Sequence, residues 1–400
     1  MSTRIENPAT PPGPAAAVAR SRWPAVGSLS LGIFVIVTSE ILPVGLLNPM
    51  AAGFGVTPGV AGLLLTLPGL TALIAAPVAT VATARFDRRV MLTAFLLLLA
   101  LANLLIAVAP SYPPVLLGRI LVGVVIGGYW SIGAGLAPRV VRPEAVSTAT
   151  AMIFAAVPVG SVLGVPLGTA LGQEFGWRTP FLVLAVASTV IAAFGRWALP
   201  ELRAVRTTSA AVLFGLVRER GTGVRTGLAV TALLVIAHFA AFTYVSPFLE
   251  SATHAGNRTV AAYLLLYGVA GVAGTAITSR ALIRGLRGTF VTAALLIAGC
   301  TALLPLLGRG PGGAIAVLAV WGLAYGLVPA CSQTWLARSA PAVPEAATVL
   351  FTAGFQATLA AGALLGGLVV DAASTSTVMR CAAVLALFAA AVAATVRTPG

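Results

Sequence analysis

Charged residues are scarce in this sequence. Only 8% of the 400 residues are charged, lysine is absent, and 59% are apolar, which gives a mean hydropathy of +1.02. Soluble globular domains carry about 25% charged residues, so this composition excludes that class. The sequence therefore indicates a protein that crosses a membrane several times.

Cysteine and histidine are also rare. The three cysteines, Cys300, Cys331 and Cys381, lie in apolar stretches without paired spacing, and the two histidines are His238 and His254. This pattern excludes a disulfide framework and a metal site, and it predicts no cofactor. Because no Walker motif or nucleophile elbow is present either, we do not expect an enzyme or a nucleotide-driven pump. An ion gradient is the energy source that the sequence favours.

Twelve apolar stretches are long enough to cross a bilayer as helices. Because spanning helices satisfy their own backbone hydrogen bonds, we predict an all-α membrane protein with twelve transmembrane helices. The stretches begin near Gly27, Gly59, Met91, Pro113, Ala149, Thr179, Val224, Thr259, Gly288, Gly312, Ala346 and Thr377.

The arginines are concentrated in alternate loops. The formal net charge is +14, and basic residues recur in every second loop, for example at Arg85, Arg88 and Arg89 after the second stretch. Cytoplasmic loops are the ones enriched in arginine. We therefore predict a multi-pass protein of the cell (cytoplasmic) membrane with both termini in the cytoplasm. The charge indicates the lipid bilayer as a partner and argues against nucleic acid.

Two halves of six predicted spans each flank the longest polar interval. A loop pattern around Pro138 returns around Pro341, each time between two apolar stretches. Internal repeats of this kind place a transport site near the middle of the membrane between the halves, with alternating access by rocking. The predicted parts are a disordered cytoplasmic tail at 1–26, an N-terminal six-helix bundle at 27–199, a cytoplasmic linker at 200–225 and a C-terminal six-helix bundle at 226–400.

Glu40 stands near the middle of the apolar segment from about Gly27 to Met50. A carboxylate within a membrane is unfavourable unless it is protonated, paired or facing water, so Glu40 is predicted to carry a proton. A structural ion pair or a protonated carboxyl inside the bundle would also fit. Arg119 lies roughly 8 Å below the outer end of its helix and Glu40 roughly 15 Å below its own, so the guanidinium could bridge most of the difference. His238 could be a second titrating group or a hydrogen-bonded core histidine.

Aromatic and amide side chains recur in several stretches. Around a cavity they would suit a moderately apolar or amphipathic solute, and they could equally be ordinary core. The fifth stretch carries glycines at four-residue spacing with prolines between them, which is typical of close helix packing that can change. The candidate cavity residues are Thr38, Trp130, Phe242, Tyr244, Tyr325, Gln333, Phe355 and Gln356, and the candidate packing or gating residues of the fifth stretch are Gly160, Gly164, Pro166 and Gly168.

Motifs in both halves are shared with a known family. They are Thr38-Ser39-Glu40 with Pro43-Val44-Gly45-Leu46, Gly118-Arg119, Gly160 to Gly168, Gly176-Trp177-Arg178, Phe242 to Glu250, Trp321-Gly322, Gln333-Thr334-Trp335 and Gly362 through Asp371. By these motifs the chain resembles the major facilitator superfamily, and more narrowly its drug/proton antiporter group, which includes bacterial arabinose and sugar efflux permeases. The resemblance covers nearly the whole chain beyond the tail and implies two pseudo-symmetric six-helix bundles.

The resemblance also implies roles for individual residues. Glu40 resembles the first-helix acid that these antiporters use as a proton site, and Arg119 resembles the fourth-helix arginine associated with proton coupling. Arg85, Arg88 and Arg89 align with the gating loop after the second helix, although the usual glycine and acid of that loop are replaced. The glycines of the fifth stretch resemble the antiporter motif, with Gly-Val-Pro where Gly-Pro is expected.

These observations predict proton-coupled efflux of a small molecule, either a drug-like amphiphile or a sugar, by alternating access. Protonation of Glu40 from outside and substrate binding from inside would alternate at one central cavity. The nearest alternative is a uniporter or solute/proton symporter of the same fold, and a transport-inactive membrane scaffold or sensor is an alternative of another class. The expected partners are the substrate, protons and lipid, and the proteins that this chain resembles are usually monomers.

Overall fold

Helices make up the regular structure of the chain. The computed structural model contains no strand in the residues that it describes, and twelve helices among them are long and apolar enough to cross a membrane. This confirms the predicted all-α class with twelve spans. The described residues are 21–82, 86–133, 135–202, 218, 223–253, 256–341 and 344–396.

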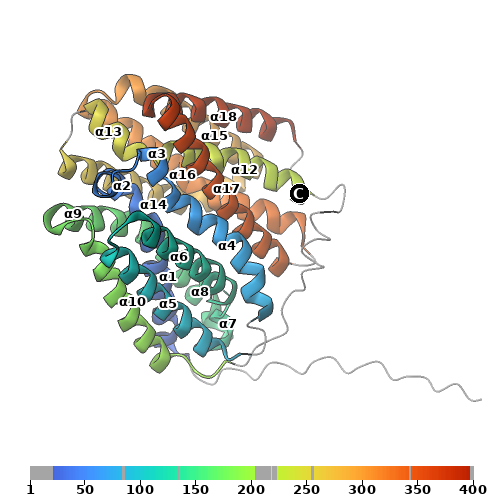
Figure 1. The fold of residues 1–400 in the computed structure, drawn as a ribbon. Coiled ribbons are helices and arrows are strands. Elements are labelled where there is room, and N and C mark those ends of the chain that lie inside the picture. Colours follow the sequence, from blue (N-terminus) through green and yellow to red (C-terminus); the bar gives the residue numbers. More distant parts are fainter. Residues whose placement is uncertain are drawn as a thin grey trace, which may run out of the picture.

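The helices pack as two halves that follow one another along the chain (Figure 1). The N-terminal half contains α1 (Trp23–Ile41), α2 (Pro43–Phe54), α3 (Pro58–Ala61), α4 (Leu63–Ala82), α5 (Arg88–Val108), α6 (Tyr112–Gly133), α7 (Ala137–Val140), the 3-10 turn η1 (Pro143–Ala145), α8 (Val146–Val159), the π-helical turn η2 (Gly160–Gly164), α9 (Val165–Phe175) and α10 (Thr179–Ala198). The C-terminal half contains α12 (Gly223–Phe242), α13 (Val245–Thr253), α14 (Asn257–Arg284), α15 (Leu286–Leu307), α16 (Pro311–Ser339), α17 (Pro344–Ala372) and α18 (Thr375–Thr395).

Pro43 interrupts the hydrogen bonding of the first span, which the sequence predicted as one continuous helix, although the backbone at Leu42 stays helical. α1 begins at Trp23, inside the predicted tail, and ends at Ile41, and α2 starts at Pro43. Proline has no N–H to donate, so the helix loses a backbone hydrogen bond at this point. Residues 1–20 of the predicted tail and most of the predicted linker at 200–225 lie outside the described residues.

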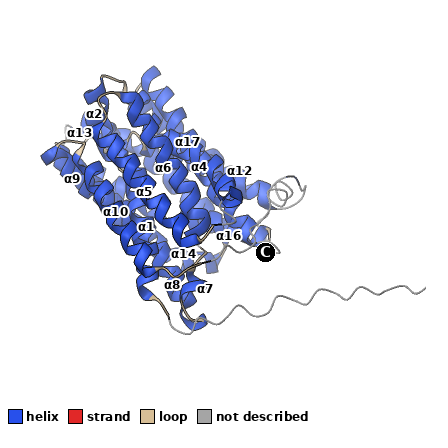
Figure 2. Cartoon of the chain, turned by 60° about the horizontal axis from the view of Figure 1, so that its bottom comes forward, coloured by secondary structure: helices blue, strands red, loops and turns tan. Residues whose placement is uncertain are grey.

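Because successive spans run in opposite directions, the helix termini and loops gather at two ends of the bundle. The near end carries the start of α1, the loop between α4 and α5, and the last turn of α18, whereas the far end carries the turns after α2 and α9. Figures 1 and 2 both show α2, α9 and α13 together at the far end, while α7 and the start of α12 lie apart at the near end. The two halves therefore approach each other more closely at the far end.

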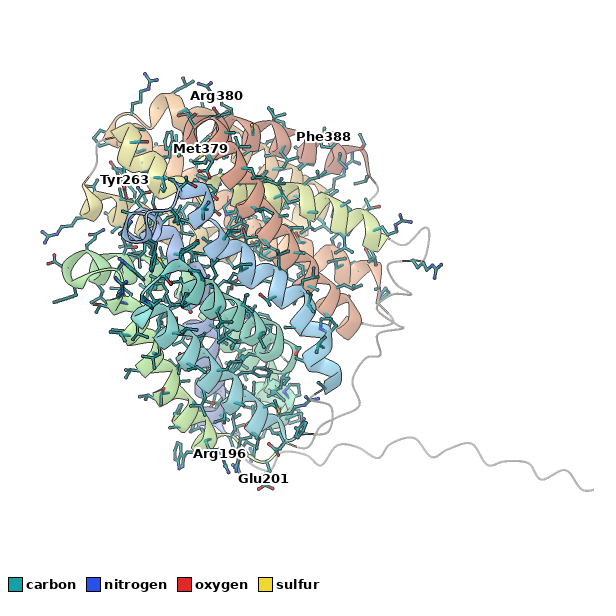
Figure 3. The ribbon with its side chains drawn as sticks, viewed as in Figure 1. Arg196, Glu201, Tyr263, Met379, Arg380 and Phe388 are labelled. Atoms are coloured by element: carbon teal, nitrogen blue, oxygen red, sulfur yellow. The ribbon has the colours of Figure 1, made fainter. Side chains whose placement is uncertain are left out.

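The outward faces of the outermost helices are apolar. Val186 on α10 and Phe388 on α18 are exposed, and Figure 3 shows Phe388 pointing away from the bundle. Met379 on the same helix is fully buried. Charged side chains such as Arg196 and Glu201 lie at the near end of α10 (Figure 3). An apolar belt with charged residues at its end is what a helix bundle presents to a bilayer.

Candidate transport site between the two halves

The glycines of the fifth span face the first span. The Thr38 hydroxyl donates a hydrogen bond to the Gly160 carbonyl at 3.4 Å. A Cβ atom on Gly164 would collide with Thr38, and one on Gly168 would collide with Leu42. Because these positions have no side chain, the fifth span lies against the broken part of the first. Thr38, expected to line a cavity, is buried in this packing.

The fifth span also changes its helical register beside the first. The π-helical turn η2 ends directly before α9, in which Pro166 occupies the first turn. Proline cannot donate to the carbonyl one turn earlier, and π turns are frequent at functional sites of helices. The predicted packing or gating residues of this span therefore lie in or beside an irregular turn. This turn contacts α1 in its own half and α14 in the C-terminal half.

Arg119 of α6 is fully buried and donates hydrogen bonds to main-chain carbonyls. Its Nε donates to the Leu64 carbonyl at 2.5 Å, and its two terminal nitrogens donate to the carbonyls of Ser39 and Glu40 at 2.7 Å each. The predicted bridge from Arg119 thus reaches the main chain of Glu40, while the Glu40 carboxylate has another partner. A single guanidinium joins α1, α4 and α6.

Two of these carbonyls lack their usual helical donor. In a regular helix the Ser39 carbonyl would accept from residue 43 and the Leu64 carbonyl from residue 68. Both positions are prolines, Pro43 at the start of α2 and Pro68 inside α4, and neither has an N–H. Arg119 therefore supplies the donors that the two prolines remove. Its buried charge is accommodated by the carbonyl oxygens that it pairs.

The Glu40 carboxylate connects the two halves. Gln356 of α17 donates from Nε2 to Oε1 of Glu40 at 2.7 Å, and each residue is only 8% exposed. Arg119 lies close enough for its charge to interact with that of Glu40, and the neutral hydroxyl of Tyr325 lies within reach of the Glu40 charge. Glu40 is thus a buried acid whose side-chain hydrogen bond crosses the interface between the halves.

Asn103 fixes the residue next to Glu40. The Ser39 hydroxyl donates to Oδ1 of Asn103 at 2.8 Å, and the Asn103 amide donates to the Leu99 carbonyl at 3.0 Å. Ser39 and Asn103 are both fully buried between α1 and α5. Asn103 was not predicted to belong to the site, and its signal in the sequence is a lone amide inside an apolar stretch.

His238 lies in an aromatic cluster of the C-terminal half. Its ring stacks on Tyr325 with centroids 3.5 Å apart and planes 6° from parallel. Trp321 donates from Nε1 to Nδ1 of His238 at 3.2 Å, and the Tyr267 hydroxyl lies 3.4 Å from Nε2. A ring nitrogen that accepts a hydrogen bond carries no proton, so this imidazole is neutral with its hydrogen on Nε2. The arrangement favours the hydrogen-bonded core histidine over the second titrating group.

Phe242 and Phe355 belong to the same aromatic cluster. Phe242 stacks on Tyr267 with centroids 4.7 Å apart, and Phe355 of α17 contacts Phe239 edge-on at 6.4 Å. Tyr325 and Phe355 are half-buried. The structure therefore places flat ring surfaces in the same region as the Glu40–Gln356 hydrogen bond. We define the central site as these aromatic rings together with Glu40 and Gln356.

The structure describes three further candidate cavity residues. Tyr244 is fully buried, its hydroxyl donates to a carbonyl of α17 at 2.9 Å and lies against Gly62 of the N-terminal half, so it packs between the halves at the far end. Trp130 is half-buried and contacts a phenylalanine of α8 with centroids 6.0 Å apart. Gln333 is half-buried on α16. Sequence alone could not show which candidates share a site, because depth in the membrane does not give the direction in which a side chain points.

Asp371 joins the halves at the far end. Its carboxylate accepts hydrogen bonds from the Thr57 hydroxyl at 2.6 Å and from the Gly59 backbone N–H at 2.9 Å. A Cβ atom on Gly59 would collide with Asp371, and one on Gly62 would collide with Tyr244. The glycines of this segment therefore permit a close approach between α3 and α17. Asp371 was quoted only as the end of a motif, and a carboxylate at the end of a span gave no stronger signal.

Two further polar contacts join the halves at this end. Asn48 of α2 donates to the Glu250 carboxylate of α13, and Arg258 of α14 forms an ion pair with Glu174 of α9 at 2.6 Å. The ion pair is largely exposed, so it contributes about 0–1 kcal/mol. We call these pairs, with the Asp371 hydrogen bonds, the far-end contacts.

The predicted gating loop packs within its own half. Arg88 is largely buried, and its backbone N–H donates to the Leu202 carbonyl at 2.9 Å. The Asp87 carboxylate accepts from the Leu202 N–H at 2.8 Å, and the Arg89 guanidinium donates to a carbonyl at the end of α10 at 3.3 Å. Arg85 lies outside the described residues. These contacts tie the loop to α10.

Comparison with known proteins identifies the family. The sequence profile described as Major Facilitator Superfamily matches residues 29–349, so the chain belongs to this superfamily. The purine ribonucleoside efflux pump NepI of Escherichia coli (strain K12) is 33% identical over 355 residues, which is 89% of each chain. The transcription regulatory protein OpdE of Pseudomonas aeruginosa is 33% identical over 372 residues, which is 92% of each chain.

Solved structures share the fold at low sequence identity. The nucleoside transporter NupG has a TM-score of 0.79 and 13% identity, covering 93% of this chain and 100% of that one. A bacterial homolog of the human lysosomal transporter Spinster, in an inward-facing and occupied conformation, has a TM-score of 0.74 and 13% identity over 93% and 96% of the two chains. The protein is thus a multi-pass membrane transporter of this superfamily and not an enzyme.

Proposed function

We propose that this transporter exports a small molecule in exchange for protons, as in the drug/proton antiporter group that its motifs resemble. The observation that carries the proposal is the buried Glu40 carboxylate, which accepts a hydrogen bond from Gln356 across the interface. A titratable group shared between two moving parts lets one proton shift the balance between their arrangements. The arginine-rich loops at the near end support placing that end in the cytoplasm.

The proposed substrates are purine nucleosides. This class is the one named for NepI, which resembles this chain over most of its length. The chemistry of the central site supports it, because a flat base can stack on the aromatic cluster while its N–H groups and ring nitrogens bond a carboxylate and an amide. The drug-like amphiphiles and sugars expected from the sequence become the alternatives to be tested beside nucleosides.

The far-end contacts support an inward-facing assignment for this structure. They hold the halves together on the side that would face outward, and α7 and α12 lie apart on the other side (Figure 2). In the proposed cycle, Glu40 releases its proton to the cytoplasm in this state and the substrate then binds. The halves rock, the far-end contacts break, the substrate leaves, and Glu40 takes up a proton from outside.

A flux measurement tests the proposed function. The purified protein is reconstituted into liposomes that contain a pH-sensitive dye, and adenosine, inosine, guanosine, arabinose and a cationic dye are added in turn. We expect the nucleosides to evoke proton movement opposite to their own, and empty liposomes give the baseline. Nucleoside flux without proton movement would indicate a uniporter, and proton movement in the same direction would indicate a symporter.

A regulatory role is the second candidate, because the relative OpdE carries the name of a transcription regulatory protein. Such a protein could bind a small molecule without transporting it. Binding of a nucleoside to the purified protein, measured by calorimetry, together with no flux in the liposomes would favour this candidate. Flux of any of the compounds would exclude a transport-inactive protein.

Replacing Asp371 by asparagine is expected to open the far end. The amide has one acceptor oxygen and no charge, so neither hydrogen bond remains charge-assisted and the Thr57 hydroxyl can no longer donate unless the Gly59 N–H gives up its acceptor. A loss of about 1–2 kcal/mol would change the ratio of closed to open forms by roughly 5- to 30-fold. Spin labels on the exposed residues Ala52 and Ser251 would report longer distances by pulsed electron resonance. Unchanged distances would show that Asp371 does not hold this end closed, and Glu201→Gln at the near end is the matched control.

A further inference from the structure

Gln356 is held in place by its backbone. The helix α17 lies so close to α4 that a Cβ atom on Gly69 would stand 2.6 Å from the Gln356 carbonyl and 2.8 Å from the Ala360 Cβ. No side chain larger than hydrogen fits there without movement of one helix. The position of the Gln356 amide therefore follows the position of α17 against the N-terminal half.

Charged and titratable side chains from other helices also face Glu40. The positive charge of Arg119 of α6 acts on Glu40, and the charge of Glu40 acts on the neutral hydroxyl of Tyr325 of α16. Arg119, however, directs its three hydrogen bonds at carbonyl oxygens, and two of those belong to Ser39 and Leu64. The direct side-chain hydrogen bond to the carboxylate comes from Gln356. That donor belongs to the other half, whereas Arg119 belongs to the same half as Glu40.

We propose that Gln356 couples proton release by Glu40 to the arrangement of the two halves. Its amide N–H stabilises the ionised carboxylate while α17 lies against α1 and α4, and this stabilisation ends when α17 moves away. A hydrogen bond donated to a carboxylate favours the charged form over the protonated form. Gln356 is in this sense a positioning residue that acts through Glu40. The use of the released proton for export rests on the proposed function.

The proposal gives the cycle a direction. When the far end closes, Gln356 reaches Glu40 and the carboxyl loses its proton toward the near end. When the far end opens, the donor withdraws and a buried carboxyl without a partner takes a proton up again. The proton affinity of Glu40 is then low when the far end is closed and high when the far end is open. Exchange of protons against a substrate requires such an alternation.

Infrared spectroscopy of the purified protein tests this step without any substrate. The carboxyl C=O band of Glu40 is identified as the band that disappears in Glu40→Gln, and its intensity is followed against pH. Gln356→Met keeps the length of the side chain and removes the donor. Since a hydrogen bond to a charged group contributes enough to move a titration by about one to two units, we expect the midpoint in Gln356→Met to rise by about one to two pH units.

The controls separate a specific effect from a general loss of structure. Gln173→Met makes the same chemical change on α9, and its titration should match that of the unmodified protein. Gln356→Asn retains an amide that is one methylene too short, so its midpoint should rise as well. If both Gln356 variants are folded and titrate like the unmodified protein, Gln356 does not stabilise the ionised carboxylate and the proposal is wrong.

The dependence on the arrangement of the halves has its own test. In Asp371→Asn, the midpoint for Glu40 should move toward the value of Gln356→Met, because opening the far end withdraws the donor. In the double variant that combines Asp371→Asn with Gln356→Met, the second change should shift the midpoint for Glu40 little further. If the spin labels show an open far end and the midpoint is unchanged, proton release is not coupled to this motion. A failure of nucleoside transport would leave these titrations unaffected, so the two proposals fail separately.

Discussion

Replacing Glu40 by glutamine is expected to abolish substrate-driven proton movement. The variant has nearly the same shape, and its amide oxygen can still accept the hydrogen bond from Gln356, so the protein should fold normally. It cannot take up or release a proton. Without a titratable carboxyl at this position no proton is carried in the cycle, so we expect coupled flux to fall to the level of empty liposomes.

The liposome assay resolves what the variant keeps and what it loses. Exchange of labelled inosine outside for unlabelled inosine inside needs the two halves to rock but needs no net proton movement, so this exchange should persist in Glu40→Gln. Uptake driven by an imposed pH gradient should fall to the level of empty liposomes. Loss of both activities would point to a damaged site instead of a missing proton carrier.

The control for Glu40 is another carboxylate changed in the same way. Glu201 is exposed at the near end, and Glu201→Gln should transport like the unmodified protein. If Glu40→Gln itself still pumps against a gradient, the proton is carried elsewhere. His238 would be examined next, by His238→Gln in the same assay, although its present hydrogen bonds are those of a neutral ring.

The sequence predicted the membrane class and the number of spans because both depend on composition and length. The burial of Glu40 within the bundle was also predictable, since a carboxylate in an apolar segment stands out without knowledge of its neighbours; its role as a proton carrier stays a prediction. The identity of its partner was not predictable. Gln356 lies 316 positions later in the chain, and the depth of two residues in a membrane does not show that they share an interface.

The break in the first span shows a different limit of sequence reasoning. Pro43 was visible, and proline commonly interrupts a helix, yet apolar length favoured one continuous span from Gly27 to Met50. A proline in a membrane helix is tolerated when a neighbouring group satisfies the freed carbonyl. Here that group is Arg119, which belongs to another helix, so the outcome depends on tertiary packing.

Replacing Arg119 by methionine is expected to destabilise the N-terminal half strongly. The change leaves the carbonyls of Ser39 and Leu64 buried without a donor, because Pro43 and Pro68 cannot supply one. An unsatisfied buried polar group costs about 1–3 kcal/mol, so the expected loss is about 2–6 kcal/mol. Thermal unfolding of the purified protein in detergent would show it as a lower midpoint.

Restoring the backbone donors should compensate for the missing arginine. In a Pro43→Ala, Pro68→Ala background, residues 43 and 68 can each donate an N–H to the carbonyl one turn earlier. Arg119→Met should therefore lower the stability of this background clearly less than that of the unmodified chain. Pro77→Ala is the matched control, since Pro77 also lies inside α4 and its effect should simply add to that of Arg119→Met.

The loss of stability on Arg119→Met, compared between these backgrounds, separates two roles of Arg119: donating to main-chain carbonyls and placing a positive charge near Glu40. If the restored donors recover stability, the guanidinium acts on the fold by replacing the N–H groups that two prolines remove, and the broken first span depends on it. Equal losses in all backgrounds would instead attribute the effect to its charge near Glu40. Transport by the rescued triple variant then measures the electrostatic contribution alone, because the backbone that positions Glu40 has been repaired without the arginine.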